Sequence, residues 1–343
     1  MKCYFALTAP KKDSDAYVDL LEVSLKSARQ NTTMHLVALY DGSKESRCYK
    51  LLQQYEVEII EHQFSHKKYT DELYKVDFGG RPTDSDKVAG TFMRLDIPFV
   101  EQEEEFVLYT DIDVIFLKDI TLEDLPKPQY LAGCSEFNMV QNMEEYFNAG
   151  VLVLNVRNMR EMCNCIFDDL KHGRTVVAFD QGYLNKYCLA SRTWLPFEFN
   201  WKPYWGINPD ASIVHFHGMK PGSTIAESGF GMSETVIINI TQSKESFAGQ
   251  LYYYIKYFTL LDSATIDWQR WVAEFMAYVN ELLLLNVKNN LPHEGNPFCV
   301  AYAQKKLKKK KKQYKVINVL TLGVTYKRNK KKLKAYREHL GLQ

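Results

Sequence analysis

The sequence predicts an α/β domain built around a mostly parallel central sheet. Short apolar runs alternate with helical patterns through residues 1–222, as expected for strands joined by helical crossovers. Polar residues that could carry chemistry follow several of these runs directly, and ligands of such sheets bind at the carboxyl ends of the strands. The 343 residues are 46% hydrophobic and 25% charged, a globular composition that excludes a disordered chain.

Each predicted strand is a short apolar run bounded by polar or turn residues. The second run, for example, ends at the turn pair Asp41-Gly42. Strands buried on both faces of a parallel sheet are expected to be apolar throughout. On this criterion we predict strands at residues 4–8, 35–40, 57–61, 106–110, 149–156 and 212–216.

Helical spacing of apolar residues marks further segments. Residues 15–30 form a predicted helix with Ser14 as N-cap, and residues 85–97 form another that is expected to stop at Pro98. Beyond residue 222 the pattern changes to two aromatic-rich helices, at 247–261 and 268–285. We therefore expect three parts: a catalytic domain (1–222), a helical extension packed on it (223–304) and a basic tail (305–343).

The charge of the chain is divided between its two ends. Thirteen Lys, two Arg and one Glu give residues 305–343 a net charge of +14, which leaves −13 for residues 1–304. Seven lysines in residues 305–312 cannot pack in a core. The apolar and basic residues that follow suit a segment lying on an anionic membrane surface. A solvated, solubilising tail is the alternative.

Cysteine use and hydropathy predict the compartment. The seven cysteines contain no C-x-x-C pair, which favours reduced thiols in a reducing compartment. No apolar run reaches the ~18–20 residues of a membrane-spanning helix, and the apolar start is better interpreted as a buried strand than as a signal peptide. We expect a cytoplasmic protein whose tail can attach it peripherally to the inner face of a membrane.

Asp111-Ile112-Asp113 is the strongest chemical signal. The two carboxylates directly follow the predicted strand 106–110, and such a pair can bind a hard divalent cation while leaving positions for a diphosphate. A D-x-D pattern is weak alone, since residues 13–15 and 84–86 repeat it in polar, cap-like surroundings. The alternative is that one of the two acids simply caps a turn.

His215, at the end of the last predicted strand, is the preferred third metal ligand. His217, on the opposite side of that strand, is the fallback, and a packing role is the alternative for either histidine. Gly218 and Lys220 follow, and a lysine there could neutralise phosphate charge.

Six motifs in order make the chain resemble the retaining glycosyltransferases of family 8, the group that contains glycogenin and the lipopolysaccharide galactosyl- and glucosyltransferases. The motifs span residues 1–222. They are YFALTA (4–9), GTFMRL (90–95), LYTDIDVIF (108–116), FNAGVLVLN (147–155), DQGYLN (180–185) and HFHGMKPG (215–222).

This resemblance implies a GT-A-type fold with a single Rossmann-like nucleotide-binding domain, a UDP-sugar donor, a glycan or glycolipid acceptor and Mn²⁺ or Mg²⁺. It places the metal on Asp111, Asp113 and His215, and the catalytic positions at Asn148, Asp180 and Gln181. The nucleotide-sugar would contact Leu7, Thr8, Arg94, Asp111, Ile112, Asp113, Asn148, Ala149, Gln181, His215, Gly218 and Lys220. Two departures from the family pattern are the single residue between Gly218 and Lys220, and Gly222 in place of a tryptophan.

Structural roles are the alternatives for three of these residues. Arg94 could form an exposed salt bridge, Asn148 could be a turn residue, and Asp180 could cap a helix that begins at Gln181. Because an amide is a poor nucleophile, we expect front-face substitution, in which the leaving diphosphate assists the incoming hydroxyl.

Two other functions are weighed against a glycosyltransferase. A sugar-1-phosphate nucleotidyltransferase would need a glycine-rich phosphate loop after the first strand, and TAPKKDSD (8–15) has no glycine. Binding of nucleic acid through the tail is disfavoured, because the tyrosines at 314, 326 and 336 are too scattered for base stacking. A catalytically dead scaffold is disfavoured because all three expected metal ligands are present.

Overall fold

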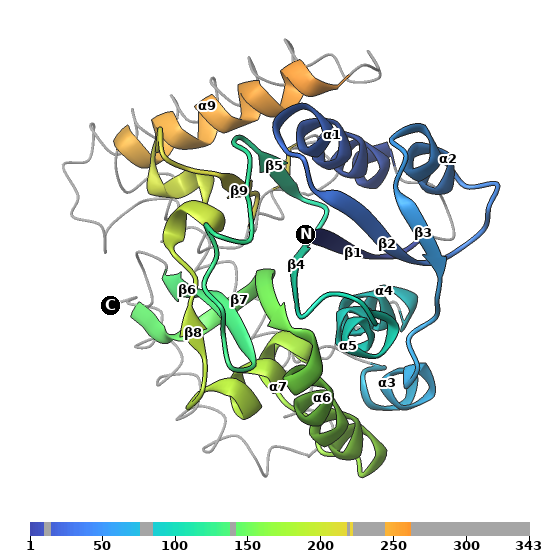
Figure 1. Cartoon of the computed structure of the whole chain (residues 1–343). Coiled ribbons are helices and arrows are strands. Elements are labelled where there is room, and N and C mark those ends of the chain that lie inside the picture. The colour runs from blue at the N-terminus through green and yellow to red at the C-terminus, as the bar shows by residue number, and fades with distance from the viewer. Residues whose placement is uncertain (10–14, 76–84, 138–141, 218–219, 222–243, 262–343) are drawn as a thin grey trace, which may run out of the picture. The chain divides into compact units, whose positions relative to one another are not determined.

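The computed structural model describes residues 1–9, 15–75, 85–137, 142–217, 220–221 and 244–261 (Figure 1). The chain divides into two compact units, Met1–Trp268 and Gln269–Gln343, and all described residues belong to the first. Ser14, Gly218, the predicted helix 268–285, the basic tail and both predicted domain boundaries lie outside the described residues, so these predictions stay as stated.

A seven-stranded mixed sheet forms the centre of the first unit, in the order β3-β2-β1-β4-β7-β6-β8. Its first half is parallel: β1 (Lys2–Thr8) pairs with β2 (His35–Asp41) and β4 (Phe106–Thr110), and β2 pairs with β3 (Glu58–Glu61). All five side chains of β4 are buried, as a central strand covered on both faces requires. The mostly parallel α/β fold predicted from the sequence is confirmed.

The second half of the sheet reverses direction at β7 (Asn142–Asn155). This long strand is antiparallel to β4 and to β6 (Leu131–Phe137), while the short β8 (Thr193–Trp194) runs parallel to β6. A separate two-stranded antiparallel sheet pairs β5 (Val114–Phe116) with β9 (Ile213–His215). The strand predicted at 212–216 therefore belongs to this small sheet and not to the central one.

Two apolar cores lie on the two faces of the central sheet. One contains side chains of α1 (Asp15–Asn31) and α2 (Arg47–Gln54), and the other contains side chains from the helices that follow in the chain (Figure 1). The latter are α3 (Lys67–Leu73), α4 (Ser85–Phe92), η1 (Met93–Asp96), α5 (Ile97–Val100), α6 (Val156–Lys171) and α7 (Phe179–Cys188). The short helices η2 (Phe197–Phe199) and η3 (Pro203–Trp205) precede β9, and α9 (Lys244–Leu260) packs against η3 and α1.

The helix predicted over residues 85–97 is wrong in its extent. The α-helix ends at Phe92, the chain continues as the 3₁₀ turn η1, and Pro98 lies in the first turn of α5 instead of ending a helix. Proline is tolerated at that position because the first helical N–H groups have no partner within the helix. The tighter turn of η1 carries Arg94, whose side chain is almost fully buried.

None of the helices in the described part of the chain combines the length and the apolar character that a membrane-spanning segment needs. The six cysteines of that part are free thiols, five of them buried.

Candidate active site

The D-x-D segment lies between the end of β4 and the start of β5, where backbone bonds to two other strands position it. The N–H of Asp111 donates to the carbonyl of Gly150 in β7 at 2.8 Å, and the N–H of Phe216 donates to the carbonyl of Asp113 at 2.8 Å. The first bond extends the β4–β7 ladder by one residue, and the second continues the β5–β9 pairing. Both acids are thus held between two sheets.

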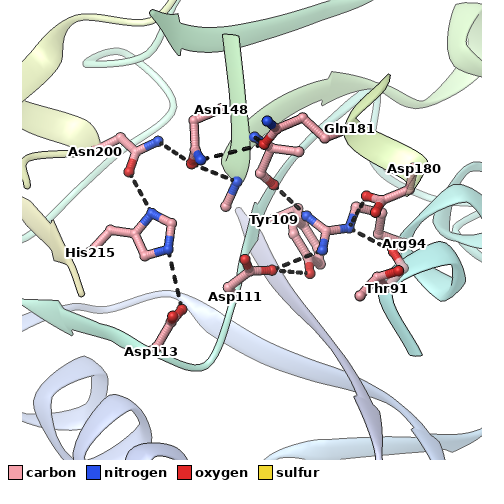
Figure 2. A network of polar contacts seen from close by, with 12 residues as sticks. Thr91, Arg94, Tyr109, Asp111, Asp113, Asn148, Asp180, Gln181, Asn200 and His215 are labelled. Carbon is pink, nitrogen blue, oxygen red and sulfur yellow. Dashed lines mark hydrogen bonds and ion pairs between the residues drawn. The ribbon is translucent and has the colours of Figure 1, made fainter. Parts of the chain in front are cut away.

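Asp111, Asp113 and His215 form a cluster with the composition of a metal site. One ligand atom of each lies within 4.8 Å of those of the other two. Oδ1 of Asp113 is buried, accepts no hydrogen bond from the described residues and lies 3.3 Å from Nε2 of His215 (Figure 2). Two carboxylates and an imidazole are ligands that Mn²⁺ and Mg²⁺ accept. The residues present therefore fit the divalent cation that the sequence predicts.

His215 is held as a neutral imidazole. It is 3% exposed, and burial lowers its pKa to about 4, although the charge of Asp111 opposes this shift. Nδ1 of the ring lies 2.9 Å from Oδ1 of Asn200, a fully buried residue in the segment before η3. An imidazole held on one nitrogen in this way can offer the other nitrogen to a metal.

Arg94 connects Asp111 to Asp180. Its guanidinium forms ion pairs of 3.0 Å with Oδ1 of Asp111 and with Oδ2 of Asp180, and it also donates to the carbonyls of Ala149 and Thr91 (Figure 2). Burial opposes its charge, but the two carboxylates raise the pKa of Arg94 above its usual value. The exposed salt bridge considered for Arg94 is therefore wrong, because this residue is a buried junction of the site.

Tyr109, the residue before the end of β4, also contacts this junction. The guanidinium of Arg94 stacks over the Tyr109 ring at 4.5 Å from its centroid, and the Tyr109 hydroxyl donates to Oδ1 of Asp111 at 2.6 Å. Asp111 therefore receives two donors on one oxygen, which fixes the orientation of its carboxylate.

Asp180 lies in the first turn of α7, after a strained stretch of backbone. Ala178 and Phe179 both have left-handed φ angles, 66° and 52°, which are uncommon for residues other than glycine. The helix begins at Phe179 with Ala178 as N-cap, so the interpretation of Asp180 as the cap of a helix beginning at Gln181 is wrong. Burial raises the pKa of Asp180 to about 6, although Arg94 lowers it.

Side-chain amides extend the site from α7 to β7. Oε1 of Gln181 accepts from the N–H of Ala149 at 2.8 Å and from Nδ2 of Asn148 at 3.4 Å. Oδ1 of Asn148 accepts from the N–H of Gly150 at 2.9 Å and from Nδ2 of Asn200 at 3.1 Å (Figure 2). Asn148 lies within β7, so it is not the turn residue considered as an alternative.

The remaining expected site residues lie in different surroundings. Lys220 donates to Oδ2 of Asp113 and, at 2.9 Å, to the carbonyl of Phe216, so its ammonium reaches the acidic cluster. His217 contacts Glu136 at 3.5 Å and the Tyr204 hydroxyl at 3.2 Å, and its ring centroid lies 5.7 Å from that of His215, but it is not one of the three clustered ligands.

Three residues expected to contact the nucleotide belong to the β1 and β4 region. Leu7 is fully buried in the apolar core of the α1 face, and Ile112 packs against that core. Oγ1 of Thr8, at the end of β1, is buried and has no hydrogen-bond partner among the described residues. The roles expected for these residues in binding the nucleotide stay predictions.

Several residues near the site carry no signal in the sequence analysis. Asn200 and Tyr109 organise the metal ligands, and a buried ion pair joins Lys202 to Glu136 at 2.7 Å. Burial opposes ionisation of Glu136, but the ammonium of Lys202 lowers the pKa of that carboxyl to about 2. Glu136 lies in the mostly apolar strand β6, and a carboxylate in such a strand is a sequence signal that could have marked it as a candidate site residue. Asn200 has no such pattern around it.

The chain belongs to glycosyl transferase family 8, whose family model matches residues 13–226. It is thus a glycosyltransferase with a GT-A-like α/β fold. No curated protein matches its sequence.

Solved structures with similar architecture include three transferases. The galactosyltransferase LgtC in complex with donor and acceptor sugar analogs is 17% identical, with a TM-score of 0.48 over 78% of this chain and 99% of that one. The apo-form glycosyltransferase GlyE of Streptococcus pneumoniae TIGR4 is 18% identical, with a TM-score of 0.48, and the match covers 81% of this chain and 63% of GlyE. Mouse xyloside xylosyltransferase 1 is 14% identical, with a TM-score of 0.46, and the match covers 63% of this chain and 97% of that transferase.

Proposed function

We propose that this family 8 enzyme transfers a hexose from a UDP-sugar to a glycan, lipid-linked or protein acceptor, with retention of the donor configuration. The observation that carries this proposal is the cluster of Asp111, Asp113 and His215 at the ends of two strands. Mn²⁺ or Mg²⁺ bound by these residues would neutralise the charge of the diphosphate as it leaves. Lys220, whose ammonium already reaches Asp113, would contribute a further positive charge there.

The contacts of Gln181 and Asp180 support front-face substitution. A double displacement needs an oxygen that attacks the anomeric carbon, but Oε1 of Gln181 already accepts two hydrogen bonds. The Asp180 carboxylate is paired with Arg94 at 3.0 Å. In the proposed step the bond from the anomeric carbon to the diphosphate breaks, the acceptor hydroxyl forms the new bond, and its proton passes to the diphosphate.

Calorimetry with UDP, with and without Mn²⁺, tests the nucleotide and metal part of this proposal. We expect UDP to bind only with Mn²⁺ and EDTA to remove the binding. Asp113→Asn should abolish it, whereas Asp210→Asn, at a position whose side chain is 86% exposed, should leave it unchanged. Equal affinity of the Asp113→Asn variant in Mn²⁺ would overturn the assignment of the metal site.

A panel of UDP-sugars tests the transfer. Metal-dependent hydrolysis of one donor in the absence of acceptor would identify the sugar, and NMR of the anomeric proton of the transfer product would report its configuration. A product with inverted configuration would contradict the proposed mechanism.

A further inference from the structure

A chain of hydrogen bonds leads from the backbone of β7 to the imidazole of His215. It begins at the N–H of Gly150, which donates to Oδ1 of Asn148 at 2.9 Å. A backbone N–H can only donate, so the atom of Asn148 that faces it must be the carbonyl oxygen. The orientation of the Asn148 amide is therefore settled by the main chain and not by another side chain.

The orientation of Asn200 follows from that of Asn148. Asn200 is fully buried, and its amide lies 3.1 Å from Oδ1 of Asn148. An oxygen of Asn200 at this place would face another oxygen, so Asn200 must present its NH₂ group to Asn148. Its own Oδ1 is then the atom that lies 2.9 Å from Nδ1 of His215.

The tautomer of His215 is the last link. Oδ1 of Asn200 can only accept, so Nδ1 of the ring must carry the hydrogen. In a neutral imidazole, Nε2 then has the lone pair, and Nε2 is the nitrogen that lies 3.3 Å from Oδ1 of Asp113 (Figure 2). A flipped Asn200 would force the hydrogen onto Nε2 and remove that lone pair.

We propose that Asn200 is a positioning residue that holds His215 in its Nδ1–H tautomer, so that Nε2 is available to a divalent cation. The proposal rests on the metal site of the proposed function. Asn200 contacts neither the two carboxylates nor, by this inference, the cation itself, and it acts only through the ring of His215.

The tautomer can be measured without any metal. Full-length protein with ¹⁵N-labelled histidine, treated with EDTA at pH 8, gives long-range ¹H–¹⁵N spectra that distinguish the two tautomers, and His215→Gln identifies the signal. We expect the Nδ1–H form in the wild-type protein and in Asn200→Asp, whose carboxylate still accepts from Nδ1, although its second oxygen faces Oδ1 of Asn148 and should lower the stability of this variant. Asn200→Leu should shift His215 towards the Nε2–H form. An Nε2–H tautomer in the wild-type protein overturns the proposal, even if Asn200→Leu does not fold.

Binding of Mn²⁺, followed by its EPR signal in the presence of UDP, gives the second measurement. We expect about 10- to 100-fold weaker binding in Asn200→Leu, the range typical for loss of a group that orients a metal-bound histidine. Asn200→Asp should bind more tightly than Asn200→Leu. A matched control is Asn155→Ala, which removes another buried asparagine, the N-cap of α6. It should lower the melting temperature but keep the Mn²⁺ affinity.

The two measurements separate the two proposals. Wild-type protein that shows the Nδ1–H tautomer but does not bind Mn²⁺ with UDP would contradict the proposed metal-dependent function. Wild-type protein that binds Mn²⁺, together with Asn200→Leu of equal affinity, would contradict the role of Asn200 alone.

Discussion

The imidazole of His215 lies directly against the Cα of Gly150. A Cβ atom at position 150 would come within 2.2 Å of Cε1 of His215 and within 2.9 Å of both ring nitrogens. Contacts below 3 Å require one group to move, and the contact of Nδ1 with Asn200 holds the ring in place. The absence of a side chain at Gly150 is therefore a condition for the place that His215 occupies.

Gly150→Ala should displace His215 and weaken the metal-dependent binding of UDP. Overpacking of a buried site costs about 1–3 kcal/mol, so the variant should still fold. We expect at least a tenfold loss of affinity in calorimetry with UDP and Mn²⁺. The control is Gly133→Ala, where the added Cβ would press on Phe147 at 2.7 Å and not on His215. Equal effects of both variants on affinity would contradict the specific role of Gly150.

Arg94 and Asp180 should show strong energetic coupling. Removal of one partner from a buried ion pair costs about 3–5 kcal/mol, because the other charge stays buried. Urea unfolding of Arg94→Met, Asp180→Asn and the double variant should give a coupling energy of about 1–3 kcal/mol. The exposed pair of Lys44 and Glu61 provides the comparison and should couple far more weakly. Additive effects at Arg94 and Asp180 would contradict the buried junction.

The raised pKa of Asp180 predicts how stability depends on pH. Between pH 4 and 6 the folded protein holds a proton that the unfolded chain has released, since burial raises this pKa from 3.8 to about 6. The free energy of unfolding should therefore fall as pH rises through this window, by up to about 3 kcal/mol. Asp180→Asn has no such proton, so its stability relative to the wild-type protein should increase from pH 4 to pH 7.

Urea titrations of both metal-free proteins at several pH values measure this difference. His215 and His217, whose pKa values burial lowers, titrate in both proteins and therefore cancel in the comparison. A difference that does not change with pH would show that Asp180 is ionised throughout.

Attachment of the basic tail to an anionic membrane remains a prediction, and a lipid-binding experiment can test it. Each lysine near an anionic surface contributes about 1 kcal/mol, so removing residues 305–343, which carry a net charge of +14, should release the protein from the membrane. We expect the full-length protein to float with vesicles that contain phosphatidylserine, and the variant to stay in solution. Both should hydrolyse free UDP-sugar equally. Flotation of both forms would show that the tail is not the anchor.

The sequence predicts the position of the strand that precedes Asp111 and Asp113 better than it predicts how the strands pair with one another. β4 is predicted with its exact bounds because a central parallel strand must be apolar throughout. Asp111 and Asp113 stand out for the same reason, since charged residues that end such a strand need a partner. The antiparallel direction of β7 is not visible, because a buried apolar run has the same composition in either direction.

Asn200 could not be predicted because its role depends on groups distant in the chain. Asn200 acts on His215 only after the segment before η3 folds against β9, and nothing in its neighbours indicates this. The break of the helix at Phe92 is missed for a similar reason. Of the partners of Arg94, only Thr91 is close in the chain; the other three, Asp111, Ala149 and Asp180, become its neighbours only in the folded protein.

β7 runs past the end of β4, whose last residue pairs with Val151. The peptide groups of Ala149 and Gly150 beyond that point bind Arg94, Gln181, Asn148 and Asp111. This part of the site consists of main-chain groups, so only a substitution to proline, which removes a backbone N–H, can delete one of its donors, and no substitution deletes its carbonyl acceptors. The surrounding side chains can diverge while this scaffold persists. Amide-to-ester exchange in a semisynthetic chain would be needed to remove one of these links singly.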